Sequence, residues 1–148
     1  MKLYMSALLA TLALVFLAPT QVAAETTDLV AGRNITIGTV SVNADGGDVV
    51  VAYQITEPGW CIGLTHLYLG DTPPVKGAPG QFPYQADAGC AQSFEYRVPL
   101  TASFLYVAAH AEVERTDGGK GETAWGTGTD RLRGGWGTYF QVIFSVPE

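Results

Sequence analysis

The feature that most constrains the fold is the recurrence of apolar residues at every second position through several segments of the chain. From Ser93 to Leu100, and again from Phe104 to Arg115, every second residue is apolar. This spacing places the apolar side chains on one face of a β-strand, whereas a helical period would repeat every three to four residues. The alternation recurs at 48–56, 66–69 and 140–146. We therefore expect an all-β domain.

Turn-forming residues separate the alternating segments. Asn43–Gly47 and Asp117–Gly121 are rich in glycine, asparagine and aspartate, which favour hairpin turns. With a short strand at 123–125, the pattern predicts about seven strands in one domain, 33–148. This number is typical of an immunoglobulin-like antiparallel β-sandwich, and a jelly roll or a small barrel is the alternative architecture.

The strand that opens this domain changes phase. Ile35 and Ile37 share one phase of the alternation, while Val40 and Val42 share the other. A β-bulge at Gly38–Thr39, or a strand that passes from one sheet to another, would keep both pairs buried.

The first 24 residues have the pattern of a secretory signal peptide. A positive start at Met1–Lys2 precedes an apolar run, Ala7–Ala18, and a small-residue exit that ends at Ala24. The run is shorter than the roughly 20 residues that a membrane-spanning helix needs, and Pro19 ends it. We expect cleavage near Ala24, a flexible polar lead at 25–32, and a secreted protein located outside the cell or in a periplasm.

Cys61 and Cys90 are the only cysteines, and both follow the predicted signal peptide. In an oxidising compartment they are expected to form a disulfide that anchors the proline-rich connection 70–89. The whole chain carries a net charge of −6, one unit more negative once Lys2 is removed. This charge disfavours nucleic acid and anionic lipid as partners.

Candidate chemistry is sparse, and no catalytic motif is evident. His66 and His110 lie on predicted strands, and by the alternation His110 points away from the core beside Glu112. If the two strands are neighbours, the histidines could bind a metal with Glu112 or Asp71. A pair of hydrogen-bonded or surface histidines is the alternative, and the sequence leaves their adjacency open.

No cofactor is required by the pattern, although calcium is a further candidate ligand. Asp45 and Asp48 flank Gly46–Gly47, and calcium favours clustered loop oxygens. The stretch lacks the regular spacing of a calcium-binding loop.

Aromatic residues give the best indication of a binding surface. Several lie on the non-core face of their strands or beside glycine-rich turns, where a flat ring is free to stack on a sugar. Together with the histidines, the candidate ligand-binding residues are His66, Tyr68, Tyr106, His110, Trp125, Trp136 and Tyr139. Burial of these rings under loops is the alternative, because tryptophan is usually mostly buried.

Five blocks in this order carry a resemblance: THLYLG at 65–70, GQFPY at 80–84, YVAAHAEV at 106–113, ETAWG at 122–126 and GWGTYF at 135–140. The chain resembles a recurring β-sandwich module of secreted and cell-surface bacterial proteins, whose role is unassigned. The resemblance implies an extracellular β-rich domain in which His66, His110, Glu122 and Trp125 belong to the framework.

The sequence therefore predicts a non-enzymatic binding or adhesion module whose ligand is a glycan or another envelope component. Two alternatives remain open at this stage. The first is a structural subunit that self-associates through its edge strands. The second is a small metal-dependent hydrolase that uses His66, His110 and a carboxylate.

Overall fold

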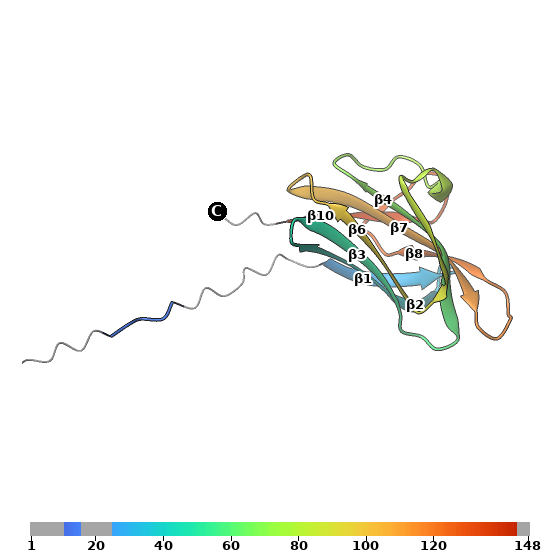
Figure 1. The fold of residues 1–148 in the computed structure, drawn as a ribbon. Coiled ribbons are helices and arrows are strands. Elements are labelled where there is room, and N and C mark those ends of the chain that lie inside the picture. Colours follow the sequence, from blue (N-terminus) through green and yellow to red (C-terminus); the bar gives the residue numbers. More distant parts are fainter. Residues whose placement is uncertain (1–10, 16–24, 145–148) are drawn as a thin grey trace, which may run out of the picture.

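We analysed a computed structural model, which describes residues 11–15 and 25–144. Within these residues the chain forms ten β-strands and one short 3₁₀ helix, η1 (Figure 1). The elements in chain order are β1 (Glu25–Ala31), β2 (Ile35–Asp45), β3 (Asp48–Ile55), β4 (Trp60–Gly70), η1 (Pro79–Gln81), β5 (Tyr84–Ala91), β6 (Ser93–Pro99), β7 (Phe104–Arg115), β8 (Glu122–Gly126), β9 (Asp130–Arg131) and β10 (Thr138–Ile143). The predicted all-β class is confirmed.

The strands make one antiparallel sheet that curls until its edges nearly meet (Figure 1). Its order is β5-β4-β7-β8-β1-β2-β3-β6, and β10 pairs with β7 outside this path. The two edge strands, β5 and β6, follow each other in the chain with only Gln92 between them. The sheet is therefore nearly closed into a barrel, an arrangement compatible with the predicted sandwich and with the small barrel that was one of its alternatives.

Polar contacts hold the two edges of the sheet together. The backbone carbonyl oxygen of Gln92 accepts a hydrogen bond from the Ile55 amide (2.8 Å). The side-chain amide of Gln92 donates a hydrogen bond to the Trp60 carbonyl oxygen (2.7 Å). Further along, the Tyr96 hydroxyl on β6 lies 2.6 Å from the Thr65 hydroxyl on β4. These bonds bridge the gap between β3–β6 and β4–β5, where no strand ladder connects the sheet.

The inward side chains form the core that the alternation predicted. Every second residue of β7 from Leu105 to Val113 is buried, as are the inward residues of β3 from Val49 to Ile55. Strands β4 and β7 also bury residues of the opposite face, His66, Ala108 and His110 among them, so this part of the sheet is covered on both faces.

The phase change in β2 arises from a β-bulge, one of the two predicted causes, but the extra residue is Ile37 rather than one of Gly38–Thr39. The pairing of β1 with β2 shifts register between Leu29 and Val30, opposite the segment that contains Ile37 and Gly38. The bulge lets Ile37 point inward on one side of the shift while Val40 does so on the other. Ile35, which was expected to be buried, is 42% exposed because it lies at the open start of the strand.

Two segments differ from the sequence-based expectation. The predicted flexible lead, 25–32, instead contains β1, which pairs with β2 and β8 and buries Leu29 and Ala31. The predicted long connection 70–89 ends early because β5 begins at Tyr84. Both strands are rich in polar or small residues, so they lack the apolar alternation that identified the others. Together with short β9, they raise the strand number above the predicted seven.

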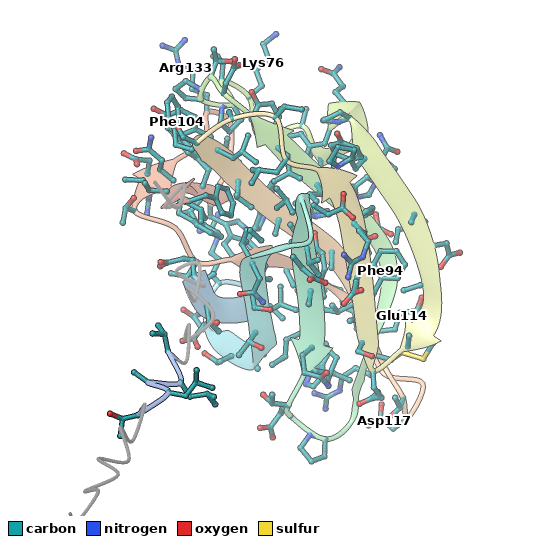
Figure 2. All side chains as sticks on the ribbon, turned by 60° about the vertical axis from the view of Figure 1, so that its left-hand side comes forward. Lys76, Phe94, Phe104, Glu114, Asp117 and Arg133 are labelled. Carbon is teal, nitrogen blue, oxygen red and sulfur yellow. A yellow bond between two sulfur atoms is a disulfide. The ribbon has the colours of Figure 1, made fainter. Side chains whose placement is uncertain are left out.

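The disulfide between Cys61 and Cys90 is present and joins β4 to β5 across 29 residues of sequence (Figure 2). The predicted signal peptide, apart from residues 11–15, lies outside the described residues. Across the described ranges, 11–15 and 25–144, there is no helix of the length and apolar character needed to cross a membrane.

Candidate functional site

The two histidines are cross-strand neighbours. His66 on β4 pairs directly with His110 on β7, and His110 pairs on its other side with Trp125 on β8. The flanking residues Thr65 and Leu67 are fully buried, so the alternation places His66 on the opposite face of the sheet, and the same holds for His110. The adjacency that the sequence left open is therefore established.

The histidines form a hydrogen-bonded pair. The Nδ1 atom of His66 lies 3.0 Å from the Nδ1 atom of His110. Such a bond requires one protonated and one unprotonated Nδ1, so at least one ring is neutral. Burial, with a further contribution from His66, lowers the pKa of His110 from 6.5 to about 3. His110 is consequently neutral over the physiological pH range.

Loops cover this face of the sheet and build a small second core. Phe82, Ala108, Trp125 and Leu132 are buried together, with Tyr68, Trp136 and Tyr139 packed against them. The Trp125 ring contacts the His110 ring edge-on at a centroid distance of 4.7 Å, and it contacts Phe82 at 6.1 Å. Trp125 is thus a wall of the site and a core residue at once.

A cavity of about 410 Å³ opens above the histidines. We call it the histidine cavity. Its side-chain lining comes from His66, His110, Glu112, Thr123, Trp125 and Trp136, and its rim comes from Gly77, Pro79, Gly80, Gly135 and Gly137. The many rim glycines leave backbone amides and carbonyls accessible to a ligand. The cavity therefore combines aromatic rings with a few hydrogen-bonding groups, as small-ligand sites commonly do.

A second cavity of about 420 Å³ adjoins the first. We call it the arginine cavity. Its own lining is Val30, Arg33, Asn34, Thr127, Arg131 and Thr138, and it shares Trp125, Gly135 and Trp136 with the histidine cavity. Trp136 is only partly buried, so its ring is open to ligand where the two cavities meet.

The other predicted site residues have different positions. The Tyr68 hydroxyl donates to the carbonyl oxygen of Thr72 at 2.6 Å, which ties it to the covering loop. Tyr106 lies outside both cavities in an aromatic row with Phe104 and Tyr139, at centroid distances of 6.1 Å. Of the seven candidates, the structure brings His66, His110, Trp125 and Trp136 around one cavity.

Two basic residues that line a cavity were missed by sequence reasoning, namely Arg33 and Arg131. Arg33 lies in the β1–β2 turn and Arg131 in β9, two segments that the strand pattern did not resolve. A signal was available for the first of them. Arg33 follows Gly32 in a tight turn where asparagine or glycine is the usual choice.

The metal hypotheses gain little from the geometry. Glu112 lines the histidine cavity, but among the described residues the one cluster of three potential ligands is Cys61, Cys90 and Glu114, whose cysteines are joined in the disulfide. The calcium candidates Asp45 and Asp48 instead bind the Arg97 guanidinium, at 2.9 Å and 3.4 Å.

Comparison with family models, with curated proteins and with solved structures finds no match to this chain.

The histidine pair predicts a specific pH dependence of stability. Between pH 6.5 and about 3 the unfolded chain binds a proton at residue 110 that the folded protein does not. The free energy of unfolding should therefore fall with decreasing pH, by up to about 1.4 kcal/mol per unit from this group. Urea unfolding at several pH values should show a shallower fall in His110→Gln than in the wild type. Equal slopes would contradict the assignment.

Proposed function

We propose that this protein is exported and acts as a non-enzymatic binding module for a glycan of the cell surface or envelope. The ring of Trp136, shared by two cavities, carries the proposal. Export is supported by the predicted signal peptide and by the disulfide, which persists in oxidising compartments. The resemblance to a secreted bacterial module agrees with this assignment.

The position of Trp136 suits a sugar ring. It extends from the segment Gly134–Gly137, where the exposed Gly135 adds no side chain beside the ring, whereas Gly137 is buried against the Trp125 ring. A sugar stacked on this ring would have polar groups within reach, because His66, His110 and Glu112 line the same cavity. Aromatic area combined with a few well-placed polar groups is the usual composition of a small-ligand site.

A binding role fits the histidine pair better than a hydrolytic one. Each Nδ1 is used in the bond to the other ring, and this bond orients both rings. The metal-dependent alternative needs a third ligand close to both histidines, and the described residues form no such group there. Self-association is the other alternative. Absence of retention in the glycan-binding experiment below would favour it over the binding role.

The proposal predicts that the exported, oxidised protein is retained by at least one polysaccharide or cell-wall preparation. Trp136→Ala should weaken retention by roughly 10- to 100-fold, because truncating a central aromatic contact commonly costs about 2 kcal/mol or more. Trp136→Phe, which keeps a ring, should lose less. Depletion of protein from solution over a panel of insoluble glycans measures both effects.

Tyr106→Ala is the matched control, since Tyr106 is an outward aromatic residue that lies in neither cavity. Trp125→Ala is unsuitable as a test, because Trp125 is 5% exposed and its loss would disturb the second core. Retention that depends on Tyr106 and not on Trp136 would move the site to the aromatic row. Absence of retention by every glycan would refute the proposal.

A further inference from the structure

The arginine cavity has an unusual charge for this protein. Two arginines, Arg33 and Arg131, both exposed to solvent, are among its lining residues, and no aspartate or glutamate is. The chain as a whole has 14 acidic and only 8 basic residues. Two of the eight basic residues of this acidic protein therefore line one cavity.

Neither arginine is neutralised by a neighbour. Within 25–144 the arginines that form ion pairs are Arg97, with Asp45 and Asp48, and Arg115, with Asp117. Arg33 and Arg131 form no ion pair with any residue that the structure describes, although Asp130 precedes Arg131 in the chain. The two guanidinium groups therefore keep their hydrogen-bond donors available to a ligand.

Two further cations lie near the rim of the neighbouring cavity. Lys76 and Arg133 face each other in an isolated β-bridge, and Figure 2 shows them side by side at one end of the molecule. Gly77 lines the histidine cavity, and its backbone amide donates a hydrogen bond to the Arg133 carbonyl oxygen at 2.9 Å. The backbone of Lys76 and Arg133 thus lies close to the histidine cavity, although neither residue lines it.

The backbone at Arg33 conflicts with its residue type. Gly32 and Arg33 have φ values of +55° and +76°, and the turn is closed by the Asn34 amide donating to the Ala31 carbonyl oxygen. Glycine adopts such values freely, whereas a residue with a Cβ does so at a cost. Non-glycine residues in this conformation are concentrated at functional sites. Glycine would adopt this backbone conformation at a lower cost. A role for the Arg33 side chain in binding would explain why arginine occupies the position.

We infer that the arginine cavity binds the negatively charged group of an acidic sugar, a carboxylate or a phosphate, while the sugar ring stacks on Trp136. The inference rests on the proposed function and narrows its ligand class. A guanidinium group donates two parallel hydrogen bonds to a carboxylate or phosphate, which gives both affinity and a fixed orientation. The ligand would then extend past Trp136 into the histidine cavity, where neutral hydroxyls meet the histidine pair.

The test compares sugar probes with and without a negative charge. Oligogalacturonate supplies carboxylates, its methyl ester supplies the same sugar without charge, and galactose 6-phosphate supplies a phosphate on a sugar ring. Dissociation constants are measured by calorimetry for the exported wild-type protein and for Arg33→Gly, Arg131→Gln and Lys120→Gln. Lys120 is the matched control, because it lies at a third cavity among Glu112, Glu114 and Glu122.

The inference predicts that one charged probe binds at least roughly tenfold more tightly than the methyl ester. The probe that does so identifies the charged group of the ligand as a carboxylate or a phosphate. Arg33→Gly and Arg131→Gln should each raise the dissociation constant of that probe roughly tenfold. Lys120→Gln should change this dissociation constant by no more than about twofold. Arg33→Gly should also raise the thermal midpoint or leave it unchanged, whereas a purely structural arginine would lower the midpoint on removal.

Equal affinity for oligogalacturonate and its ester, unaffected by either arginine variant, would overturn the inference and leave the proposed function standing. Failure of all three probes to bind would overturn it as well. In that case the glycan panel decides the proposed function separately, since retention that depends on Trp136 requires no charged ligand.

Discussion

Replacing Gly38 with alanine is expected to lower the free energy of unfolding by roughly 3 kcal/mol or more. A Cβ at this position would overlap the carbonyl oxygen of Gln54 and lie 2.9 Å from its carbonyl carbon. Both atoms belong to the backbone of β3, which is paired with β2, so they cannot move aside without breaking the ladder. Chemical denaturation of the variant measures the loss.

Gly80→Ala is the control for this substitution. A Cβ at Gly80 meets nothing within 4 Å, so its effect on stability should stay within about 0.5 kcal/mol. If Gly38→Ala unfolds at the same denaturant concentration as the wild type, the result would contradict the close approach of the β2 and β3 backbones at Gly38.

Removal of the disulfide between Cys61 and Cys90 is the second change with a large expected effect. In the chain-entropy account, opening a loop of 29 residues lowers the free energy of unfolding by about 3 to 4 kcal/mol. The effect should be concentrated at β5, because this edge strand pairs with β4 alone and buries few side chains. Urea unfolding with and without reductant measures the change, and amide exchange locates it.

The double variant Cys61→Ala and Cys90→Ala controls for effects of the reductant itself. Its stability should be low and the same in both conditions. A reduced wild type as stable as the oxidised protein, with no faster exchange in β5, would show that hydrogen bonding alone holds this edge of the sheet.

Strands with apolar alternation could be predicted from sequence because their pattern reports directly on the core. The boundaries of β7 and the inward phase of Leu105 to Val113 follow from that pattern. The strands β1 and β5 could not be predicted in this way. Glu25–Ala31 begins with four polar residues, and Tyr84–Ala91 is an edge strand of small and polar residues. Their pairing depends on partners that are distant in sequence.

The site was only partly predictable for the same reason. Alternation places His66 and His110 on the outer face of their strands, but only strand order makes them neighbours. The distinction between Trp125 and Trp136 depends on the covering loops. These loops bury the first ring to 5% exposure and leave the second open between two cavities. Arg33 and Arg131 come from a turn and a two-residue strand that carry no periodic signal.

The most direct test of the central claim, that a glycan stacks on Trp136 between the two cavities, is a nuclear magnetic resonance titration with the retained oligosaccharide. The account predicts that the indole signal of Trp136 shifts first and most, and that the ring signals of His66 and His110 follow. The signals of Phe104 and Tyr106 in the aromatic row should stay in place. Shifts centred on that row, with an unchanged Trp136 indole at saturating ligand, would contradict the account.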